Sequence, residues 1–313
     1  MKKKLLILLL ILSLVLCGCQ KQPPAHTDPV PTTPAQQGQT TQPVQTVQTL
    51  KVHFLDVGQA DCALIQCGDQ FALIDGGNYV DGYTVVNYLR ELGVTELALM
   101  VGTHPHEDHI GSLPIVLQAF DVKEVWTSAL PYRNDTVTNF TDAVASEGLT
   151  LRQPEPGTVF PLGGATITML GPVRTDYEDV NDLSLVLMVE FESTRFLFTG
   201  DMELAGETDL LDSGADVKAD VLKVGHHGSY SSTGYRFLRE VDPKYAVISV
   251  GAYNEYGHPH DEPMSRLRDA EVIVHRTDRQ YTIVATSDGE NIVFHWQNPY
   301  AQPGIPALED TSW

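Results

Sequence analysis

Apolar residues recur along most of the chain in short runs and alternating patterns that are typical of β-strands. Such patterns occur at residues 50–56, 62–66, 70–75, 96–103, 166–170, 184–190, 195–199, 221–224, 245–250, 272–275, 281–286 and 291–296. The last two are separated by Ser287-Asp288-Gly289, a sequence that favours a hairpin turn. The pattern therefore predicts a fold rich in β-sheet.

Helical periodicity is confined to a few segments. Residues 84–92 and 110–120 carry apolar side chains at helical spacing. A third helix is predicted over 233–241, with Ser231 and Ser232 as candidates for its N-terminal cap. Many strands mixed with a few helices predict sheets that are covered by helices.

The first residues form a leader. Three lysines precede an apolar run over residues 5–17, which is shorter than a bilayer span, and Leu16-Cys17-Gly18-Cys19 follows. This order is typical of a lipoprotein signal peptide over residues 1–18, with Cys19 as the lipidated first residue. The alternative is a plain secretory leader cut near Gly18. The predicted location is the outer face of the bacterial cell membrane through the anchor at Cys19, or secretion in the alternative case.

Composition divides the remaining chain into three parts. Residues 19–49 are rich in Pro, Gln and Thr with almost no large apolar side chains, which predicts an extended, disordered tether. Residues 50–297 form one continuous domain, and residues 298–313 a loose tail. A chain of 313 residues that is 42% apolar can supply one large core.

Two cysteines, Cys62 and Cys67, remain after the leader. Side chains five positions apart on a continuous strand point to opposite faces, so we expect two buried free thiols rather than a disulfide.

The charge balance is strongly acidic. The net charge is −21, and removal of the leader would take away three lysines and no acidic residue. Such a surface repels phosphate backbones at long range. This argues against tight, non-specific binding to DNA, although it does not exclude a nucleic-acid substrate.

The strongest chemical signal is the sequence His104-Pro105-His106-Glu107-Asp108-His109. Three imidazoles and a carboxylate within six residues are hard to explain by packing, because each buried imidazole needs its own partner. Nitrogen and carboxylate ligands suit Zn²⁺, and Mn²⁺ also accepts them. Since the cluster follows an apolar strand that ends at Thr103, it predicts a metal site at a strand end.

This cluster resembles the signature of the metallo-β-lactamase superfamily. Further segments are similar to the branch that includes the extracellular hydrolase domain of the DNA-uptake competence protein ComEC. They are Asp56-Val57-Gly58-Gln59-Ala60-Asp61, Leu73-Ile74-Asp75-Gly76-Gly77, Asn181-Asp182-Leu183-Ser184-Leu185-Val186-Leu187, Phe198-Thr199-Gly200-Asp201, Val224-Gly225-His226-His227-Gly228-Ser229 and Tyr256-Gly257-His258-Pro259. The resemblance implies an α+β fold, a four-layer αββα sandwich with metals at one edge of its two sheets.

The resemblance also implies two divalent metal ions, with Zn²⁺ favoured and Mn²⁺ as its competitor. His104 and His106 would bind the first ion, and Asp108 and His109 the second. Asp201, in a Thr-Gly-Asp turn, would bridge the two ions.

The doublet His226-His227 carries two further roles. His227 would complete the second metal site, while His226 could exchange roles with it or contact a phosphate, and the sequence does not separate the two. The candidate catalytic residues are Asp108, His226 and His258. For His258, in a Gly-His-Pro segment, an ordinary loop histidine is the alternative.

Several carboxylates are candidates for orienting the metal ligands from outside. Asp75, in Asp-Gly-Gly, matches the superfamily's first motif, and Asp56 and Asp61 are further candidates. Three histidines in strand patterns are interpreted as structural: His53, His275 and His295.

One departure from the superfamily pattern concerns the first metal. Many members supply it with another histidine, but this chain has no histidine between His109 and His226. Asn181 or Asp182 occupies the comparable region and is the candidate variable ligand. A site with fewer imidazoles is harder, which makes Mn²⁺ competitive and disfavours β-lactam hydrolysis.

The implied chemistry is hydrolysis by a hydroxide that two metal ions generate near neutral pH. The leading hypothesis is an extracytoplasmic phosphodiesterase or nuclease, with DNA as the substrate that the branch implies and a phosphocholine-type cell-envelope phosphoester as its rival. Alternatives are a non-catalytic tethered binding module and, less favoured, a β-lactamase or lactonase. The sequence indicates no protein partner.

Overall fold

A computed structural model describes residues 48–297 of the chain. The predicted leader, the anchor cysteine Cys19, nearly all of the predicted tether and the C-terminal tail lie outside the described residues. Within 48–297, none of the helices combines the length and the apolar character that crossing a bilayer requires.

The first sheet has eight strands in the order β17-β16-β1-β2-β3-β5-β7-β8. Its strands are β1 (Leu50–Phe54), β2 (Ala63–Cys67), β3 (Gln70–Ile74), β5 (Leu99–Gly102), β7 (Val125–Thr127), β8 (Leu151–Arg152), β16 (Thr282–Ser287) and β17 (Ile292–Gln297). Strands β3, β5, β7 and β8 are parallel, and the others pair antiparallel. The predicted hairpin at the C-terminal end of the domain is present as β16 and β17.

The second sheet has seven strands in the order β15-β14-β13-β12-β11-β10-β9. They are β9 (Val159–Leu162), β10 (Ala165–Gly171), β11 (Val186–Phe191), β12 (Thr194–Phe198), β13 (Val221–Lys223), β14 (Tyr245–Ile248) and β15 (Ile273–Arg276). Strands β12 to β15 are parallel neighbours. A separate two-stranded sheet joins β4 (Glu96–Leu97) and β6 (Asp121–Val122).

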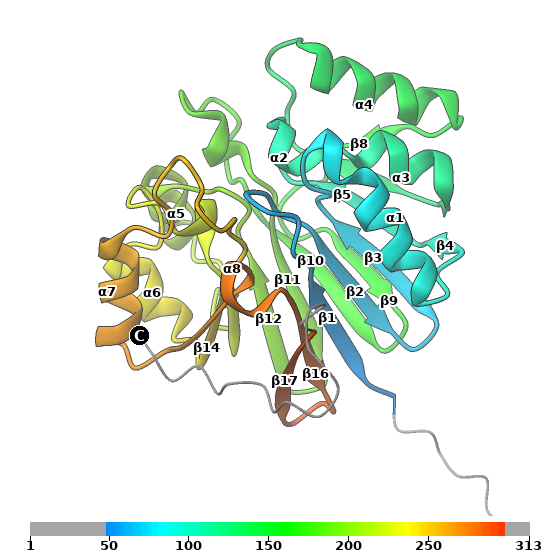
Figure 1. The fold of residues 1–313 in the computed structure, drawn as a ribbon. Helices are drawn as coiled ribbons and strands as arrows, with labels where there is room; N and C mark the ends of the chain where they lie inside the picture. Colours follow the sequence, from blue (N-terminus) through cyan, green and yellow to red (C-terminus); the bar gives the residue numbers. More distant parts are fainter. Residues whose placement is uncertain (1–47, 298–313) are drawn as a thin grey trace, which may run out of the picture. The chain divides into compact units, whose positions relative to one another are not determined.

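Helices cover the outer face of each sheet (Figure 1). Those on the first sheet are α1 (Gly82–Glu91), α2 (Glu107–Ile110), α3 (Leu113–Ala119) and α4 (Asp135–Ser146). Those of the second half are α5 (Leu204–Asp212), α6 (Tyr235–Val241), α7 (Asp261–Asp269) and the short α8 (Thr277–Gln280). Residues 48–297 also contain three 3₁₀ turns: η1 (Tyr79–Asp81), η2 (Val180–Leu183) and η3 (Gly225–Gly228).

Strand periodicity divides the buried side chains among three cores. In β11, Leu187 and Val189 pack between the two sheets, whereas Val186 and Met188 face the helices α5 to α7. A third core lies between the first sheet and α1, α3 and α4. Each large buried aliphatic side chain contributes about 1.5–3 kcal/mol. The predicted four-layer αββα sandwich is confirmed.

The apolar segment 96–103 forms two strands, although the sequence pattern predicts one. The chain bends at Ala98, whose amide donates to the carbonyl of Phe71 at 2.8 Å. This bend sends β4 into the small sheet and β5 into the large one.

The predicted helix 110–120 corresponds to α3 (Leu113–Ala119), while Ile110 is the last residue of the preceding helix α2. The break lies at Gly111 and Ser112, where a Cβ on Gly111 would sit 2.5 Å from the carbonyl oxygen of Glu107. The hydroxyl of Ser112 donates to the carbonyl of Gly76 at 2.5 Å. The break therefore fastens these helices to the loop that follows β3.

The cap predicted for the helix over 233–241 is wrong. The N-cap of α6 is Gly234, and the helix begins at Tyr235. The hydroxyl of Ser232 donates instead to the carbonyl of Gly225 at 2.7 Å, so it fastens the loop to η3. Cys62 and Cys67 are buried free thiols, as expected.

Candidate metal centre

The predicted histidine cluster begins at the end of β5 and runs into α2. His104 follows the strand closely, and His106 is the N-cap of α2. His104 is fully buried, His106 is half-buried, and His104 Nε2 lies 2.9 Å from His106 Nδ1. Two ring nitrogens at this separation either share a proton or face a common cation.

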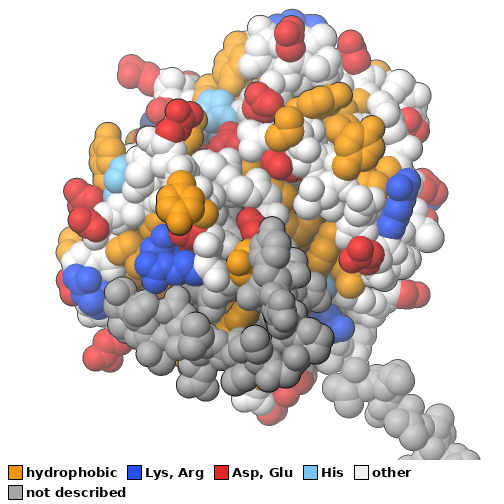
Figure 2. Space-filling model, in the orientation of Figure 1, with side chains coloured by type: hydrophobic (Ala, Val, Ile, Leu, Met, Phe, Trp, Pro, Cys, Tyr) orange, Lys and Arg blue, Asp and Glu red, His pale blue; other side chains and the backbone are white. Residues whose placement is uncertain are grey.

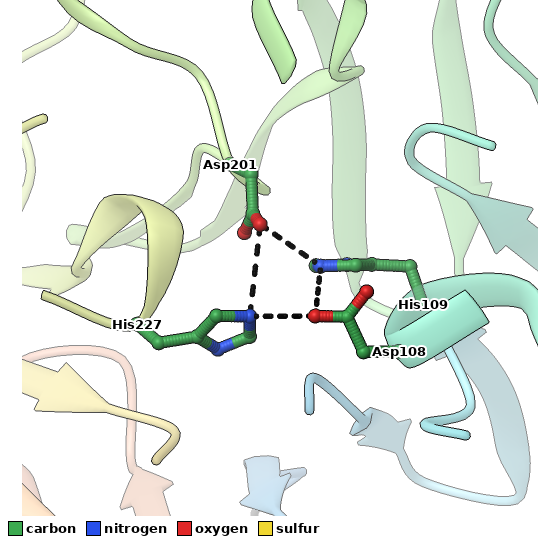
Figure 3. A group of neighbouring side chains, drawn as sticks. All are labelled: Asp108, His109, Asp201 and His227. Atoms are coloured by element: carbon green, nitrogen blue, oxygen red, sulfur yellow. Dashed lines mark hydrogen bonds and ion pairs between the residues drawn. The ribbon is translucent and has the colours of Figure 1, made fainter. Parts of the chain in front are cut away.

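Figure 3 shows four further side chains, from three separate segments, that converge on one point. They are Asp108, His109, Asp201 and His227, and one potential ligand atom from each lies within 4.8 Å of the others. Asp201 Oδ2 is 3.2 Å from His109 Nε2, and Asp108 Oδ2 is 3.1 Å from His227 Nε2. Two imidazoles and two carboxylates are a donor set that divalent ions such as Zn²⁺ accept.

Asp201 lies between this cluster and the first two histidines. Its Oδ2 is 3.9 Å from His104 Nε2 and 3.6 Å from His227 Nε2. Asp201 follows β12 through Gly200, whose φ of +51° is left-handed. The side chain that the sequence assigns as a bridge is therefore placed within reach of both groups.

The topology explains why distant segments meet here. Strands β12 and β13 are parallel neighbours, so Asp201 and His227, which follow them, lie at the same sheet edge. In the first sheet, β3 and β5 are parallel neighbours, and they are followed by Asp75 and His104. Binding residues gather at the carboxyl ends of parallel strands for this reason.

Three residues of the site have left-handed backbone conformations. The φ angle is 47° at His226, 51° at His227 and 58° at Asp75. For residues with a Cβ, this conformation costs about 1–2 kcal/mol each and is concentrated at functional sites. The amide of His226 donates to the carbonyl of Gly200 at 3.2 Å, which helps to hold the doublet in place.

A carboxylate orients the buried imidazole of His109. Its Nδ1 lies 2.8 Å from Asp75 Oδ2, so Nδ1 carries the proton and Nε2 faces Asp201. The amide of Thr103 donates to Asp75 Oδ1 and its hydroxyl to Oδ2, both at 2.8 Å. Asp75 is therefore in contact with a predicted metal ligand, the position from which it would orient that ligand.

His227 is oriented in a similar way by different partners. Its Nδ1 donates to the carbonyl of Ser249 at 2.9 Å and lies 3.2 Å from Asp61 Oδ1. Nε2 therefore faces Asp108 and Asp201. Asp61, a weaker candidate from sequence, lies directly behind a predicted ligand.

The carboxylates raise the pKa of both imidazoles. Burial alone would lower the pKa of His109, but Asp201, Asp75 and Asp108 hold it well above its usual range. Burial is likewise outweighed at His227, where Asp201 and Asp61 raise the pKa to about 10. The cluster therefore attracts positive charge, and a divalent cation would displace these protons.

Two buried polar atoms at the centre support the same conclusion. Among the described residues, His109 Nε2 and Asp201 Oδ1 have no hydrogen-bond partner. Buried polar atoms are nearly always satisfied. Coordination to a cation would satisfy both, so the residues fit a metal.

His226 lies at the rim of the centre. Its side chain is 24% exposed, Nε2 is 3.8 Å from Asp201 Oδ2, and Nδ1 is 3.0 Å from Glu203 Oε1. The same oxygen of Glu203 accepts a hydrogen bond from Ser231 Oγ at 2.6 Å. Sequence reasoning missed Glu203, because a single glutamate after the Asp201 turn carries no distinctive pattern.

His258 lies beside the histidine doublet. Its ring centroid is 5.6 Å from that of His226 and 6.3 Å from that of His227. Burial, together with the charges of His227 and His226, lowers the pKa of His258 to about 4. His258 also lines a cleft of about 760 Å³ together with Tyr253 and Arg276, so it lies between the centre and this cleft.

The two candidates for the variable ligand are placed differently. Asp182 Oδ1 accepts hydrogen bonds from the amides of Glu203 at 2.8 Å and Gly206 at 2.9 Å, so this oxygen fixes the start of α5. Asn181 Nδ2 donates to Glu203 at 3.5 Å, and Asn181 Oδ1 is buried with no partner among the described residues. Asn181 is therefore the better placed of the two to contact a bound group.

The other sequence candidates lie apart from the cluster. Asp56 Oδ1 accepts a hydrogen bond from the amide of Gly58 in the turn after β1. The three histidines predicted to be structural lie on strands: His53 contacts Tyr88, His275 stacks on Phe294 and His295 is exposed on β17.

Among known proteins, the chain is similar to ComE operon protein 3 of Bacillus subtilis, with 31% identity over 251 residues that make up 74% of this chain and 32% of that protein. It is 29% identical to Recombination protein 2 of Haemophilus influenzae, over 73% of this chain and 28% of that protein. The chain thus spans about a third of the length of these relatives. Competence protein ComA of Neisseria gonorrhoeae is also similar, at 28% identity over 71% of this chain and 30% of that protein. The predicted resemblance to the competence-protein branch is confirmed.

A solved structure shows the same fold. The metallo-beta-lactamase fold protein YhfI from Bacillus subtilis aligns with a TM-score of 0.53 at 15% identity, covering 77% of this chain and all of that one. Residues 55–252 match the family profile described as the metallo-beta-lactamase superfamily, a span that includes every predicted metal ligand. The chain belongs to the metallo-beta-lactamase superfamily.

Proposed function

We propose that this chain is a metal-dependent hydrolase that cleaves phosphodiesters. The observation that carries the proposal is the convergence of Asp108, His109, Asp201 and His227, with the His104–His106 pair adjoining through Asp201. His104 and His106 would hold a first divalent ion, and Asp108, His109 and His227 a second, with Asp201 between them. We propose Zn²⁺ for both, with Mn²⁺ as the competitor.

When bound, two such ions lower the pKa of a water molecule toward about 7 and neutralise the charge of an anionic ester. The chain's own residues supply the rest. Asp75 holds His109 through Nδ1, and the carbonyl of Ser249 with Asp61 beside it holds His227 through Nδ1, so that both Nε2 atoms face the reacting centre. This fixed arrangement removes the reorganisation that free ligands would need.

His226 is the residue placed to move a proton. Its Nδ1 faces Glu203, so its Nε2 is directed toward the centre at the exposed rim. Burial opposes protonation, but Glu203 and Asp201 raise the pKa of His226 above its usual value. A protonated Nε2 at the rim can donate to the oxygen of a departing alcohol.

The substrate has room beside His258. This residue lies beside His226 and lines a cleft of about 760 Å³, whose wall has polar and aromatic side chains that include Tyr253 and Arg276. The cleft can accept the part of the ester that lies away from the scissile bond.

The acidic surface limits how a nucleic acid could bind. Figure 2 shows acidic side chains dispersed over the displayed face and basic ones at only a few places, in keeping with the net charge of −21. A long polyanion would gain little binding free energy from contacts with the surface away from the metal centre. Similarity to competence and recombination proteins supports a nucleic acid as substrate, and a cell-envelope phosphoester is the alternative that the charge favours.

The test uses the full chain, stripped of metal with a chelator and then supplied with Zn²⁺ or Mn²⁺. Hydrolysis of bis(p-nitrophenyl) phosphate should depend on the added ion and fall more than about 100-fold in His109→Ala, since the loss of a ligand exceeds the 10–100-fold effect of losing an outer partner. The matched control is His295→Ala, which removes an exposed imidazole from β17. Activity that is indifferent to the chelator and to His109→Ala would refute the proposal.

A panel of substrates then separates the finer alternatives. Single-stranded DNA, a phosphocholine ester and a β-lactam are compared under the same conditions. Cleavage of DNA would identify a nuclease, and cleavage of the phosphocholine ester would identify a hydrolase of cell-envelope phosphoesters. Stoichiometric metal without turnover of any of them would instead indicate a tethered binding module.

A further inference from the structure

A buried lysine lies behind the metal centre. Lys223 is the last residue of β13, and only 4% of its side chain is exposed. Its Nζ donates to Asp61 Oδ2 at 2.7 Å and to the carbonyl of Val224 at 2.8 Å. The side chain of Asp61 is 7% exposed. Both charges are therefore removed from water, and each depends on the other.

The other oxygen of Asp61 faces a predicted metal ligand. Asp61 Oδ1 is 3.2 Å from His227 Nδ1, and His227 Nε2 points into the four-residue cluster. The contacts thus run in one line, from the ammonium of Lys223 through the carboxylate of Asp61 to the imidazole of His227. Asp61 lies between β1 and β2 and Lys223 ends β13, so the line also joins the two sheets.

Asp61 also belongs to a second group of side chains that could hold a cation. Asp61, Asp75 and His109 offer ligand atoms that lie within 4.8 Å of one another. A cavity lined by Asp61, Asp75 and Lys223 is only large enough for about one water molecule. The ammonium supplies the positive charge within the chain, which leaves Asp75 and His109 free for their roles at the centre.

We propose that Lys223 is a positioning residue of the metal centre. Its ammonium holds Asp61 beside His227 Nδ1, where Asp61 and the carbonyl of Ser249 together orient His227 for metal binding. Because it concerns the second metal position, this inference rests on the proposed function. Lys223 itself contacts no predicted ligand and is not a catalytic residue. Outer partners of metal ligands change metal affinity by about 10–100-fold when they are removed.

The test is a calorimetric titration of the metal-free full chain with Zn²⁺, combined with elemental analysis and thermal unfolding. Lys223→Met should weaken the binding of one of the two ions by about 10–100-fold and leave the affinity for the other closer to wild type. The control is Lys218→Met, which removes a lysine whose side chain is 67% exposed and paired with Asp242 at the surface. This control should bind both ions with wild-type affinity.

A second variant guards against loss of folding. Lys223→Met leaves the Asp61 carboxylate buried without its cation, which lowers the unfolding temperature. The double variant Asp61→Asn with Lys223→Met removes both charges and should recover much of that temperature. We expect the double variant to bind the same ion at least about tenfold more weakly than wild type, because an amide holds an imidazole less firmly than a carboxylate does.

The outcomes separate this inference from the proposed function. A wild-type chain that binds no metal would overturn the proposed function, and this inference with it. A wild-type chain that binds two ions while the folded double variant binds both with unchanged affinity would overturn only the inference. In that case, the ion pair would serve only to join the two sheets.

Discussion

The two carboxylates behind the candidate metal centre each contact a predicted ligand, but they have different partners. Asp75 orients His109 and is held by the amide and hydroxyl of Thr103, which are neutral donors. Asp61 orients His227 and is paired with an ammonium, that of Lys223.

Their pKa values move in opposite directions as a result. Burial raises the pKa of Asp75, and its imidazole and Thr103 contacts do not cancel that effect. Burial also acts on Asp61, but the charges of Lys223 and His227 outweigh it and lower the pKa. Neutral donors therefore leave a buried carboxylate easier to protonate, whereas a buried cation keeps it ionised.

The largest effect is expected from removing Asp201, the carboxylate that faces both His109 and His227. Asp201→Ala takes away the carboxylate that faces His109 at 3.2 Å and His227 at 3.6 Å. We expect Zn²⁺ affinity and the proposed phosphodiesterase activity to fall by more than about 100-fold, which exceeds the effect of losing Asp75 or Asp61. Titration with Zn²⁺ and steady-state kinetics measure both. If Asp201→Ala lost less Zn²⁺ affinity than Asp75→Asn, the assignment of Asp201 as the central ligand would be wrong.

A third buried carboxylate, Glu207, extends the comparison away from the centre. It accepts hydrogen bonds from the amides of Thr233 and Gly234 at the start of α6. Burial, only partly offset by these neutral donors, raises its pKa from 4.5 to about 7. It therefore behaves like Asp75 and unlike Asp61.

The raised pKa of Glu207 makes folding stability depend on pH. The folded state holds the Glu207 proton more tightly than the unfolded state does. The stabilisation of the folded state by this proton is therefore complete below pH 4.5 and is lost as pH rises to about 7. The loss amounts to roughly 3 kcal/mol, at 1.36 kcal/mol per pKa unit. Denaturant unfolding of the metal-free chain should show this fall in wild type and not in Glu207→Gln. Asp212 is an exposed carboxylate at the end of α5, the helix that carries Glu207. Asp212→Asn should therefore keep the wild-type dependence of stability on pH.

The sequence predicts the parts of this molecule that are local and regular. The six residues from His104 to His109 are recognisable because the ligands are adjacent in the chain, and most strands follow from alternation of apolar residues. The break at Gly111 could not be predicted, because it depends on contact with the loop after β3. Helices α4, α5 and α7 were not predicted; α7, for example, buries only Pro263 and Leu267.

The outer partners of the site were harder to find from sequence than its ligands. Glu203 and Lys223 acquire their roles only through contacts with residues 23 positions or more away, such as His226 and Asp61. One signal was present for Lys223, a charged residue inside the apolar strand segment 221–224. A lysine there must be either paired or misplaced, and the structure shows that it is paired.

A smaller effect is expected on the neutral side of the comparison. Thr103→Val keeps the shape of the side chain and removes the hydroxyl that donates to Asp75 Oδ2 at 2.8 Å. We expect a loss of about 1–3 kcal/mol of folding stability and about tenfold in Zn²⁺ affinity. Thr103→Ser, which retains the hydroxyl, should recover most of the affinity. A valine variant with wild-type affinity would show that the amide of Thr103 alone holds Asp75.

The smallest effect tests whether partners at the exposed rim matter as buried ones do. Ser231 Oγ donates to Glu203 Oε1 at 2.6 Å, and Glu203 in turn faces His226. Both residues are half-buried, so water can replace the hydroxyl in Ser231→Ala. We therefore expect a change of less than about 0.5 kcal/mol in stability and two- to threefold in kcat, measured with bis(p-nitrophenyl) phosphate. A loss above tenfold would mean that the rim is as tightly organised as the buried pairs, because solvent would then fail to substitute for a single hydroxyl.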